Sequence, residues 1–147
     1  MYKLRLVSTD EEIIQFERLR TEVFSKGRKT INTLYESPFA DAIKDGDMLA
    51  FLCMEEKRPI GGMLIRQQGK DIKLSRIFVQ KEKQGQGAGS FMLKYLDDHK
   101  NFFEDYYATD IYGIITEPLN TSVDYYFNKG YDYSGYQMYK QYKKSNK

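Results

Sequence analysis

The spacing of the apolar residues changes along the chain, from every second position to every third or fourth. Residues 3–7 alternate apolar and polar side chains, which is typical of a strand. The next segment has an apolar residue at every third or fourth position: Ile13, Phe16, Leu19 and Val23. This period predicts an amphipathic helix with one buried face. Two overlapping capping boxes, Ser8/Glu11 and Thr9/Glu12, predict where the helix begins.

Breaker residues after this helix mark a second helix and three strands. Gly27 is expected to end the first helix, and Ser37 with Pro38 starts a second one that reaches residue 43. A turn at 45–47 follows. Strand-like segments then lie at 48–55, 60–67 and 71–80, separated by the breakers KRP and QGK. Three strands with such short connections predict an antiparallel meander.

The last third of the chain again alternates helix and strand. Four residues are spaced by four, three and four positions, and predict one helix of about four turns: Met92, Leu96, His99 and Phe103. Residues 110–116 predict a buried strand, and 118–130 a short helix that Gly130 ends. One or two closing strands are expected within 131–144.

The apolar pattern slips by one residue in the third strand of the meander. Two aliphatic pairs fall on opposite faces by strict alternation: Ile72 with Leu74, and Ile77 with Val79. Such a slip suggests a β-bulge around Ser75 and Arg76. The alternative is that both faces of the strand are buried and no slip exists, which the apolar Phe78 supports.

Length, charge and cysteine content narrow the class of protein. A chain of 147 residues fits one domain, 1–147, with one core. Its net charge of +2 is too small to imply nucleic acid by itself. The single cysteine, Cys53, cannot form an intramolecular disulfide, which favours a reducing compartment. Because no apolar run is long enough for a bilayer and no secretory pattern opens the chain, we expect a cytoplasmic protein without a membrane partner.

A glycine-rich segment between the meander and the next helix carries the strongest functional signal. Its sequence, QGQGAGS at residues 84–90, has glycine at every second position. Glycine lets backbone amides crowd around a ligand, and the first turn of a helix offers unpaired N–H groups, so an anion such as phosphate is the natural guest. The P-loop pattern fails because no Gly-Lys-Ser/Thr follows. The dinucleotide fingerprint also fails, because Met92 stands where glycine or alanine is needed.

This segment resembles the acyl-coenzyme A loop of the GNAT superfamily of N-acetyltransferases. The superfamily pattern Gln/Arg-x-x-Gly-x-Gly/Ala matches residues 84–89, and Val79 stands five residues before Gln84 as the usual strand-ending valine does. Tyr126 and Gly130 match a frequent Tyr-x-x-x-Gly-Phe/Tyr ending, and the element order is similar across the chain. The resemblance implies a single-domain α/β fold with a mixed, mostly antiparallel sheet, about four helices, and a splay between the fourth and fifth strands.

The resemblance also implies acetyl-CoA as co-substrate and an amine as acceptor. Main-chain groups of Ile77, Phe78 and Val79 would pair with the pantetheine arm. The bulge would aim an N–H at the thioester oxygen. The pyrophosphate would be held by the loop: Gln84, Gly85, Gln86, Gly87, Ala88, Gly89 and Ser90. Asn120 would contact the cofactor arm, although it stands one position after the family's asparagine.

Two residues are candidates for the chemistry. Tyr126 would protonate the departing thiolate. Glu117 would accept a proton from the attacking amine, directly or through water, although relatives carry a glutamate where this chain has Ile115. No metal site is expected from a chain with one histidine and one cysteine.

Other readings of the same residues stay open. The glycine segment could be a tight turn in a nucleic-acid or ligand-binding module, or the chain could be a degenerate acyl-CoA sensor without turnover. Arg20 could form a buried ion pair or reach the acceptor pocket. Tyr35, Tyr133 and Tyr136 could line that pocket or cover a homodimer interface. We expect acetyl-CoA and an amine, rather than nucleic acid, as partners.

Overall fold

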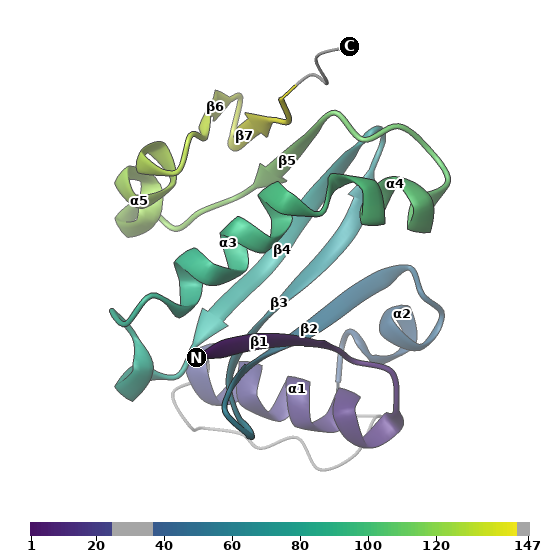
Figure 1. The fold of residues 1–147 in the computed structure, drawn as a ribbon, viewed down its shortest axis with the longest axis vertical. Helices are drawn as coiled ribbons and strands as arrows, with labels where there is room; N and C mark the ends of the chain where they lie inside the picture. The colour runs from purple at the N-terminus through teal and green to yellow at the C-terminus, as the bar shows by residue number, and fades with distance from the viewer. Residues whose placement is uncertain (25–36, 144–147) are drawn as a thin grey trace.

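A single seven-stranded sheet positions the site (Figure 1). The structure, a computed structural model, describes residues 1–24 and 37–143. The strands are β1 (Tyr2–Leu6), β2 (Met48–Glu55), β3 (Arg58–Gln68), β4 (Asp71–Val79), β5 (Gly113–Thr116), β6 (Asp132–Ser134) and β7 (Gln137–Gln141). They lie in the order β1-β2-β3-β4-β5-β7-β6. Only the β4–β5 pair is parallel, so the sheet is mixed and mostly antiparallel as predicted.

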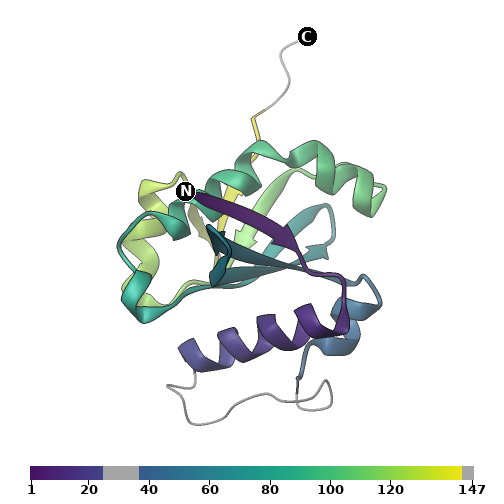
Figure 2. The same ribbon diagram turned by 60° about the horizontal axis from the view of Figure 1, so that its bottom comes forward.

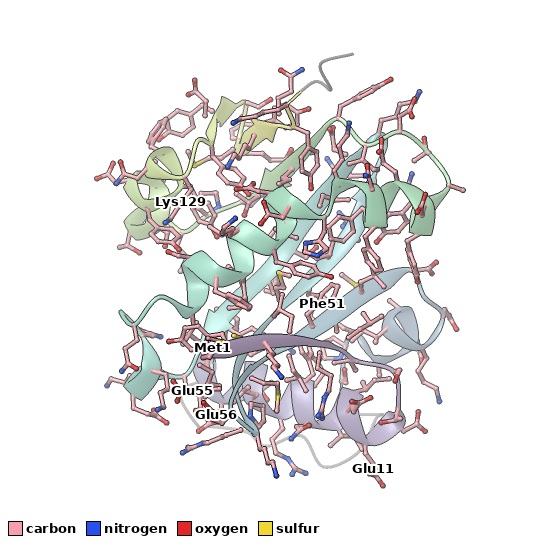
Figure 3. The ribbon with its side chains drawn as sticks, viewed as in Figure 1. Met1, Glu11, Phe51, Glu55, Glu56 and Lys129 are labelled. Atoms are coloured by element: carbon pink, nitrogen blue, oxygen red, sulfur yellow. The ribbon has the colours of Figure 1, made fainter. Side chains whose placement is uncertain are left out.

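Helices cover both faces of the sheet (Figure 2). The α-helices in the described residues are α1 (Asp10–Phe24), α2 (Ala40–Lys44), α3 (Ala88–Asp98), α4 (Lys100–Tyr107) and α5 (Val123–Asn128). Short 3-10 turns lie at Lys81–Lys83 and Asn120–Ser122. One buried cluster joins α1 to one face through Ile13, Phe16 and Leu19. The other joins α3 to the opposite face, where Phe51 lies beneath it (Figure 3).

The start of α1 follows the second of the two predicted capping boxes. Glu12 N donates to Thr9 Oγ1, and Thr9 N donates to Glu12 Oε1, each at 3.1 Å. Glu12 also accepts from the Ser8 backbone, and these hydrogen bonds lower the pKa of its carboxyl although its partial burial acts in the opposite direction. The predicted stop at Gly27 lies outside the described residues.

Three sequence-predicted boundaries differ from the structure. The single helix expected over Met92 to Phe103 is two helices, because His99 (φ −120°, ψ 30°) leaves helical geometry. The His99 ring bonds the Tyr95 carbonyl at 2.8 Å, a local contact that periodicity does not reveal. The helix expected from Ser37 begins at residue 40, because Ser37 Oγ instead caps a preceding turn by accepting from Phe39 N. The strand expected from residue 110 begins only at Gly113.

The meander confirms the predicted bulge in β4. Leu64 pairs with Arg76, and its neighbour Ile65 pairs with Leu74, so Ser75 has no partner on β3. The extra residue returns the aliphatic side chains on both sides of it to one face. These are Ile72 and Leu74, which are buried in the α3-side cluster, and Ile77 and Val79, which pack against it. Phe78 instead lies in the α1-side cluster.

The predicted splay between the fourth and fifth strands is also confirmed. β5 pairs only with Asp71–Leu74 of β4. From Ser75 onward, β4 has no partner strand on this edge within the described residues. The backbone of the second half of β4 is therefore open on the side that faces β5.

Candidate functional site

The glycine segment forms a loop that side chains hold at both ends. Gln84 Nε2 donates to Val79 O at 2.9 Å, which ties the loop to the end of β4. The Tyr2 hydroxyl donates to Gln86 O at 2.9 Å. Gly85 (φ 79°) and Gly87 (φ 97°) have positive φ, a backbone conformation that L side chains rarely adopt. Glycine is therefore required at both positions for this loop shape.

The loop presents unpaired backbone donors to open space. The helical hydrogen bonds of α3 begin with Phe91 N donating to Gly87 O at 2.9 Å. The amides of Ala88, Gly89 and Ser90 precede that bond and have no acceptor within the helix. No atom lies within 4 Å of a Cβ built on Gly85 or Gly87. Gly85 and Gly87 therefore leave space for an anion beside this helix start, while the Tyr125 hydroxyl lies 3.3 Å from a Cβ built on Gly89.

A cavity of about 670 Å³ lies over this loop. The predicted cofactor residues that line it are Ile77, Phe78, Val79, Gln84, Gly85, Gly87, Ala88, Gly89 and Ser90. Its other walls are formed by Val23, Phe24, Lys83, Leu119, Ser122, Tyr125 and Tyr126. Gln86 is not among its lining residues, and its side chain donates to Glu82 O at 3.3 Å. Asn120 begins a 3-10 turn, but its side chain lies outside what the structure describes.

Tyr126 lies where this cavity meets a second one. The second cavity, of about 500 Å³, is lined by the bulge region of β4 and by the segment after β5. Tyr126 lines both cavities and is only 4% exposed. Burial raises the pKa of its phenol, although a hydrogen bond with Thr116 acts in the opposite direction. Tyr126 is therefore protonated at neutral pH and can donate a proton.

Glu117 lines the second cavity, as Tyr126 does, but not the cavity over the glycine loop. It also lines a third cavity of about 840 Å³. Lys73 Nζ donates to Glu117 Oε1 at 2.8 Å, and Gln137 Nε2 donates to the same oxygen at 2.9 Å. These two hydrogen bonds, that of Lys73 first, lower the pKa of Glu117. Glu117 is therefore a carboxylate at neutral pH and a weaker base than an unpaired glutamate.

Arg20 forms the buried ion pair that was one of its two expected roles. Arg20 Nε donates to Glu17 Oε2 at 2.6 Å and Arg20 Nη2 to Glu17 Oε1 at 3.1 Å, and the Glu17 side chain is fully buried. Arg20 also lines the second cavity. The Glu17 carboxylate neutralises the Arg20 guanidinium, so Arg20 forms part of the cavity wall and the pair adds no net charge to it.

Several polar residues near the loop are engaged elsewhere in the protein. Lys83 pairs with Glu55 at 2.7 Å, at the end of β2 near Met1 (Figure 3). Lys94 pairs with Asp98, also at 2.7 Å.

Burial raises the pKa of Cys53 to about 11, so its thiol remains protonated and behaves as a packed apolar group.

The sequence reasoning missed several residues around the three cavities. The Tyr125 hydroxyl lies 3.1 Å from Ser90 Oγ, beside the helix start. Arg66 and Arg76 line the cavity of about 840 Å³. Strand register and the β4 bulge place these two arginines on one face, which no local pattern in the sequence reveals. Tyr133 and Tyr136 are 62% and 104% exposed on the β6–β7 hairpin, and Tyr35 lies outside the described residues.

Two searches of the described residues gave no candidate. Within 1–24 and 37–143, no helix has the length and hydropathy needed to cross a bilayer. In the same residues, no group of three or more His, Cys, Asp and Glu side chains is arranged to hold a metal ion.

Several solved structures share this fold at low sequence identity. A putative N-acetyltransferase from Lactobacillus plantarum has a TM-score of 0.69 at 16% identity, covering 95% of this chain and 97% of that one. GCN5 of Tetrahymena has 0.66 at 16% identity, covering 96% of each chain. The PaiA N-acetyltransferase of Thermoplasma acidophilum, solved with coenzyme A, has 0.63 at 13% identity, covering 97% and 99%.

Sequence comparison assigns the family. None of the curated proteins matches this chain. The family described as "Acetyltransferase (GNAT) domain" matches residues 9–142, nearly the whole chain. The mixed sheet, the splay after Leu74 and the glycine loop at the start of α3 agree with that match. The chain therefore belongs to the GNAT acetyltransferase family.

Proposed function

We propose that residues 1–147 form one N-acetyltransferase domain that moves an acetyl group from acetyl-CoA to a primary amine by direct attack. Family membership supports acetyl-CoA as the co-substrate. The observation that carries the proposal is the position of Tyr126, which lines both the cavity over the glycine loop and the cavity beside the β4 bulge. A donor and an acceptor in these two cavities would meet at its hydroxyl.

The open edge of β4 and the glycine loop suit the two ends of the cofactor. The pantetheine arm would lie along Ile77–Val79, where no strand of the described residues covers the backbone. The pyrophosphate would accept hydrogen bonds from the amides between Gly85 and Ser90. Val79 O already accepts a hydrogen bond from Gln84 Nε2, and its second lone pair remains for the pantetheine arm. The Gln84 side chain therefore holds the loop rather than the cofactor.

Tyr126 and Glu117 would handle the two proton transfers that the reaction requires. The amine nitrogen attacks the thioester carbon, the carbon–sulfur bond breaks, the nitrogen loses a proton, and Tyr126 protonates the departing thiolate. The main chain at the bulge would stabilise the oxyanion. For an amine with pKa of about 10, deprotonation at neutral pH costs about 4 kcal/mol. Glu117 is the proposed base, acting through water, and because its pKa is lowered, desolvation of the amine must supply part of this cost.

Replacement of the Tyr126 hydroxyl tests the assignment. We expect Tyr126→Phe to lower kcat by about a hundredfold, the size of a typical general-acid contribution, and to leave the Kd for acetyl-CoA nearly unchanged. Acetylation of an amine panel, followed by free-thiol detection, measures the first quantity, and titration calorimetry the second. Tyr136→Phe is the matched control because Tyr136 is fully exposed. Unchanged kcat in Tyr126→Phe would remove the role of this residue.

The same assays separate the other readings. A chain that binds acetyl-CoA but acetylates no amine would be a sensor. Thermal stabilisation by an oligonucleotide and not by acetyl-CoA would indicate a nucleic-acid-binding module instead.

A further inference from the structure

The cavity of about 840 Å³ has an excess of positive charge among its lining residues. The charged residues that line it are Asp47, Arg66, Lys73, Arg76 and Glu117. Lys73 and Glu117 neutralise each other at 2.8 Å. Arg66 and Arg76 form no ion pair of 4 Å or less with any described residue, and Arg66 only adds a weaker attraction to Glu117. Two guanidinium groups thus face one remaining carboxylate, that of Asp47.

The β4 bulge brings the two arginines to the same cavity. Arg66 on β3 lies opposite Lys73, so their side chains share a face of the sheet. Because Ser75 is the extra residue, Arg76 returns to that face as well. Arg76 is held in place: its Nη1 donates to Ser75 O at 2.6 Å, and its Cζ lies 5.7 Å from the Phe39 ring. Its other N–H donors remain for a ligand.

A single small molecule can reach from these arginines to the reacting atoms. Arg76 and Glu117 line both the 840 Å³ and the 500 Å³ cavities. Ile77 and Tyr126 line both the 500 Å³ cavity and the cofactor cavity. An amine placed near Tyr126 would therefore have its other end in the cavity that Arg66 and Arg76 line.

Ser75 adds an unpaired polar atom to the same path. Its Oγ is buried and has no hydrogen-bond partner among the described residues. Ser75 lines both the 500 Å³ and the 840 Å³ cavities. A buried hydroxyl without a partner costs free energy unless a ligand or water satisfies it. The bulge residue is therefore a further polar contact for a bound acceptor.

We propose that the acceptor is a small amine that also carries an anionic group, a carboxylate or a phosphate, bound by Arg66 and Arg76. This rests on the proposed function and names its substrate class. A guanidinium fork pairs with either anion through two parallel hydrogen bonds. A polyamine would instead bring a second cation against two arginines, so the same cavity disfavours it.

Matched acceptors test the charge requirement. Glycine, β-alanine and γ-aminobutyrate are compared with their amides, and O-phosphoethanolamine with ethanolamine, which separates carboxylate from phosphate. We expect kcat/KM to be about tenfold or more higher for the anionic member of at least one pair, the effect of a charged hydrogen bond. The double variant Arg66→Gln/Arg76→Gln should abolish that preference, so that the ratio of kcat/KM between the anionic and the neutral member falls to about one. Arg58→Gln, at the opposite end of β3 and exposed, should leave that ratio unchanged.

The outcomes distinguish this inference from the proposed function. Equal or better acetylation of the neutral members, or a preference that survives in the double variant, overturns the anion proposal and leaves the transferase standing. If no amine is acetylated although acetyl-CoA binds, the proposed function fails. Titration of CoA-loaded protein with β-alanine and β-alaninamide, and with O-phosphoethanolamine and ethanolamine, then decides the anion proposal by itself, since equal affinities or no binding in both pairs would overturn it.

Discussion

The ion pair between Lys73 and Glu117 sets the protonation of the proposed base. The hydrogen bond from Lys73 is the main reason that the pKa of Glu117 is lowered. A carboxyl with a lowered pKa stays ionised to a more acid pH and gains its proton only as the pH falls through that lower value. We therefore expect Lys73→Met to raise the pKa of Glu117 toward the usual range of a glutamate. NMR titration of the Glu117 carboxyl carbon measures the midpoint directly.

The pH dependence of the reaction rate should follow the pKa of Glu117. If Glu117 accepts the proton, its carboxylate form is the active one, and the acid limb of kcat/KM in Lys73→Met should move to higher pH. Lys57→Met, in the exposed β2–β3 turn, is the control and should leave both the titration and the limb in place. An unchanged Glu117 midpoint in Lys73→Met would mean that the ion pair does not form in solution.

Single residues differed in how far the sequence could predict them. Tyr126 could be singled out because its spacing to Gly130 is local, and it lines two cavities, while its catalytic role stays a prediction. For Arg20 the buried ion pair is confirmed, because Glu17 lies one helical turn away, and its contact with an acceptor stays a prediction. Arg66 and Arg76 could not be predicted as a pair, because only strand register brings β3 and β4 residues together.

At the scale of elements, the glycine loop and the start of α3 act as one unit. Gly87 adopts φ 97° with open space where a Cβ would stand, so Gly87→Ala strains the backbone without a clash. That strain costs about 1–2 kcal/mol in a left-handed conformation. We expect the variant to relieve it by shifting the loop amides, and to weaken acetyl-CoA binding by about tenfold. Titration calorimetry measures the Kd and chemical denaturation the stability.

Gly69 provides a control for backbone strain alone. It lies in the β3–β4 turn, also has positive φ, and has no atom within 4 Å of a built Cβ. Gly69→Ala should therefore lose stability while its acetyl-CoA affinity stays at the wild-type value. Wild-type affinity in Gly87→Ala as well would show that the loop amides do not bind the cofactor.

Element boundaries were predictable where the signal is periodic and failed where it is a specific contact. The bulge was visible because it shifts the apolar phase of β4 by one position. The break between α3 and α4 was not, because the His99 ring bond to Tyr95 O leaves the apolar spacing intact. β5 starts late because Ile111 N donates to the Glu104 carboxylate at 2.9 Å, a contact between segments that no local pattern encodes.

At the scale of the whole molecule, the site is a row of three neighbouring cavities along β4. The cavity over the glycine loop and the charged cavity each share lining residues with the 500 Å³ cavity, which lies where β4 and β5 splay apart after Leu74. Family resemblance could predict the splay and the loop from sequence. The charged cavity could not be predicted, because its walls come from β3, β4, α4 and the segments before β2 and after β5. Such a set is defined only once the chain has folded.

This arrangement predicts a ternary complex. Tyr126 lines both cavities that we propose for the donor and the acceptor, so both substrates would be bound at once and the amine would attack the thioester directly. The Cys53 thiol is unsuited to carry the acetyl group as a covalent intermediate, because it is fully buried and its pKa is raised to about 11. We expect initial rates at varied acetyl-CoA and amine to give intersecting double-reciprocal lines. Parallel lines, or an acetylated enzyme detected by mass spectrometry after acetyl-CoA alone, would instead require a covalent intermediate and would rule out direct attack. Cys53→Ala distinguishes the two cases further, because it should leave kcat unchanged under direct attack and abolish turnover if the thiol carries the acetyl group.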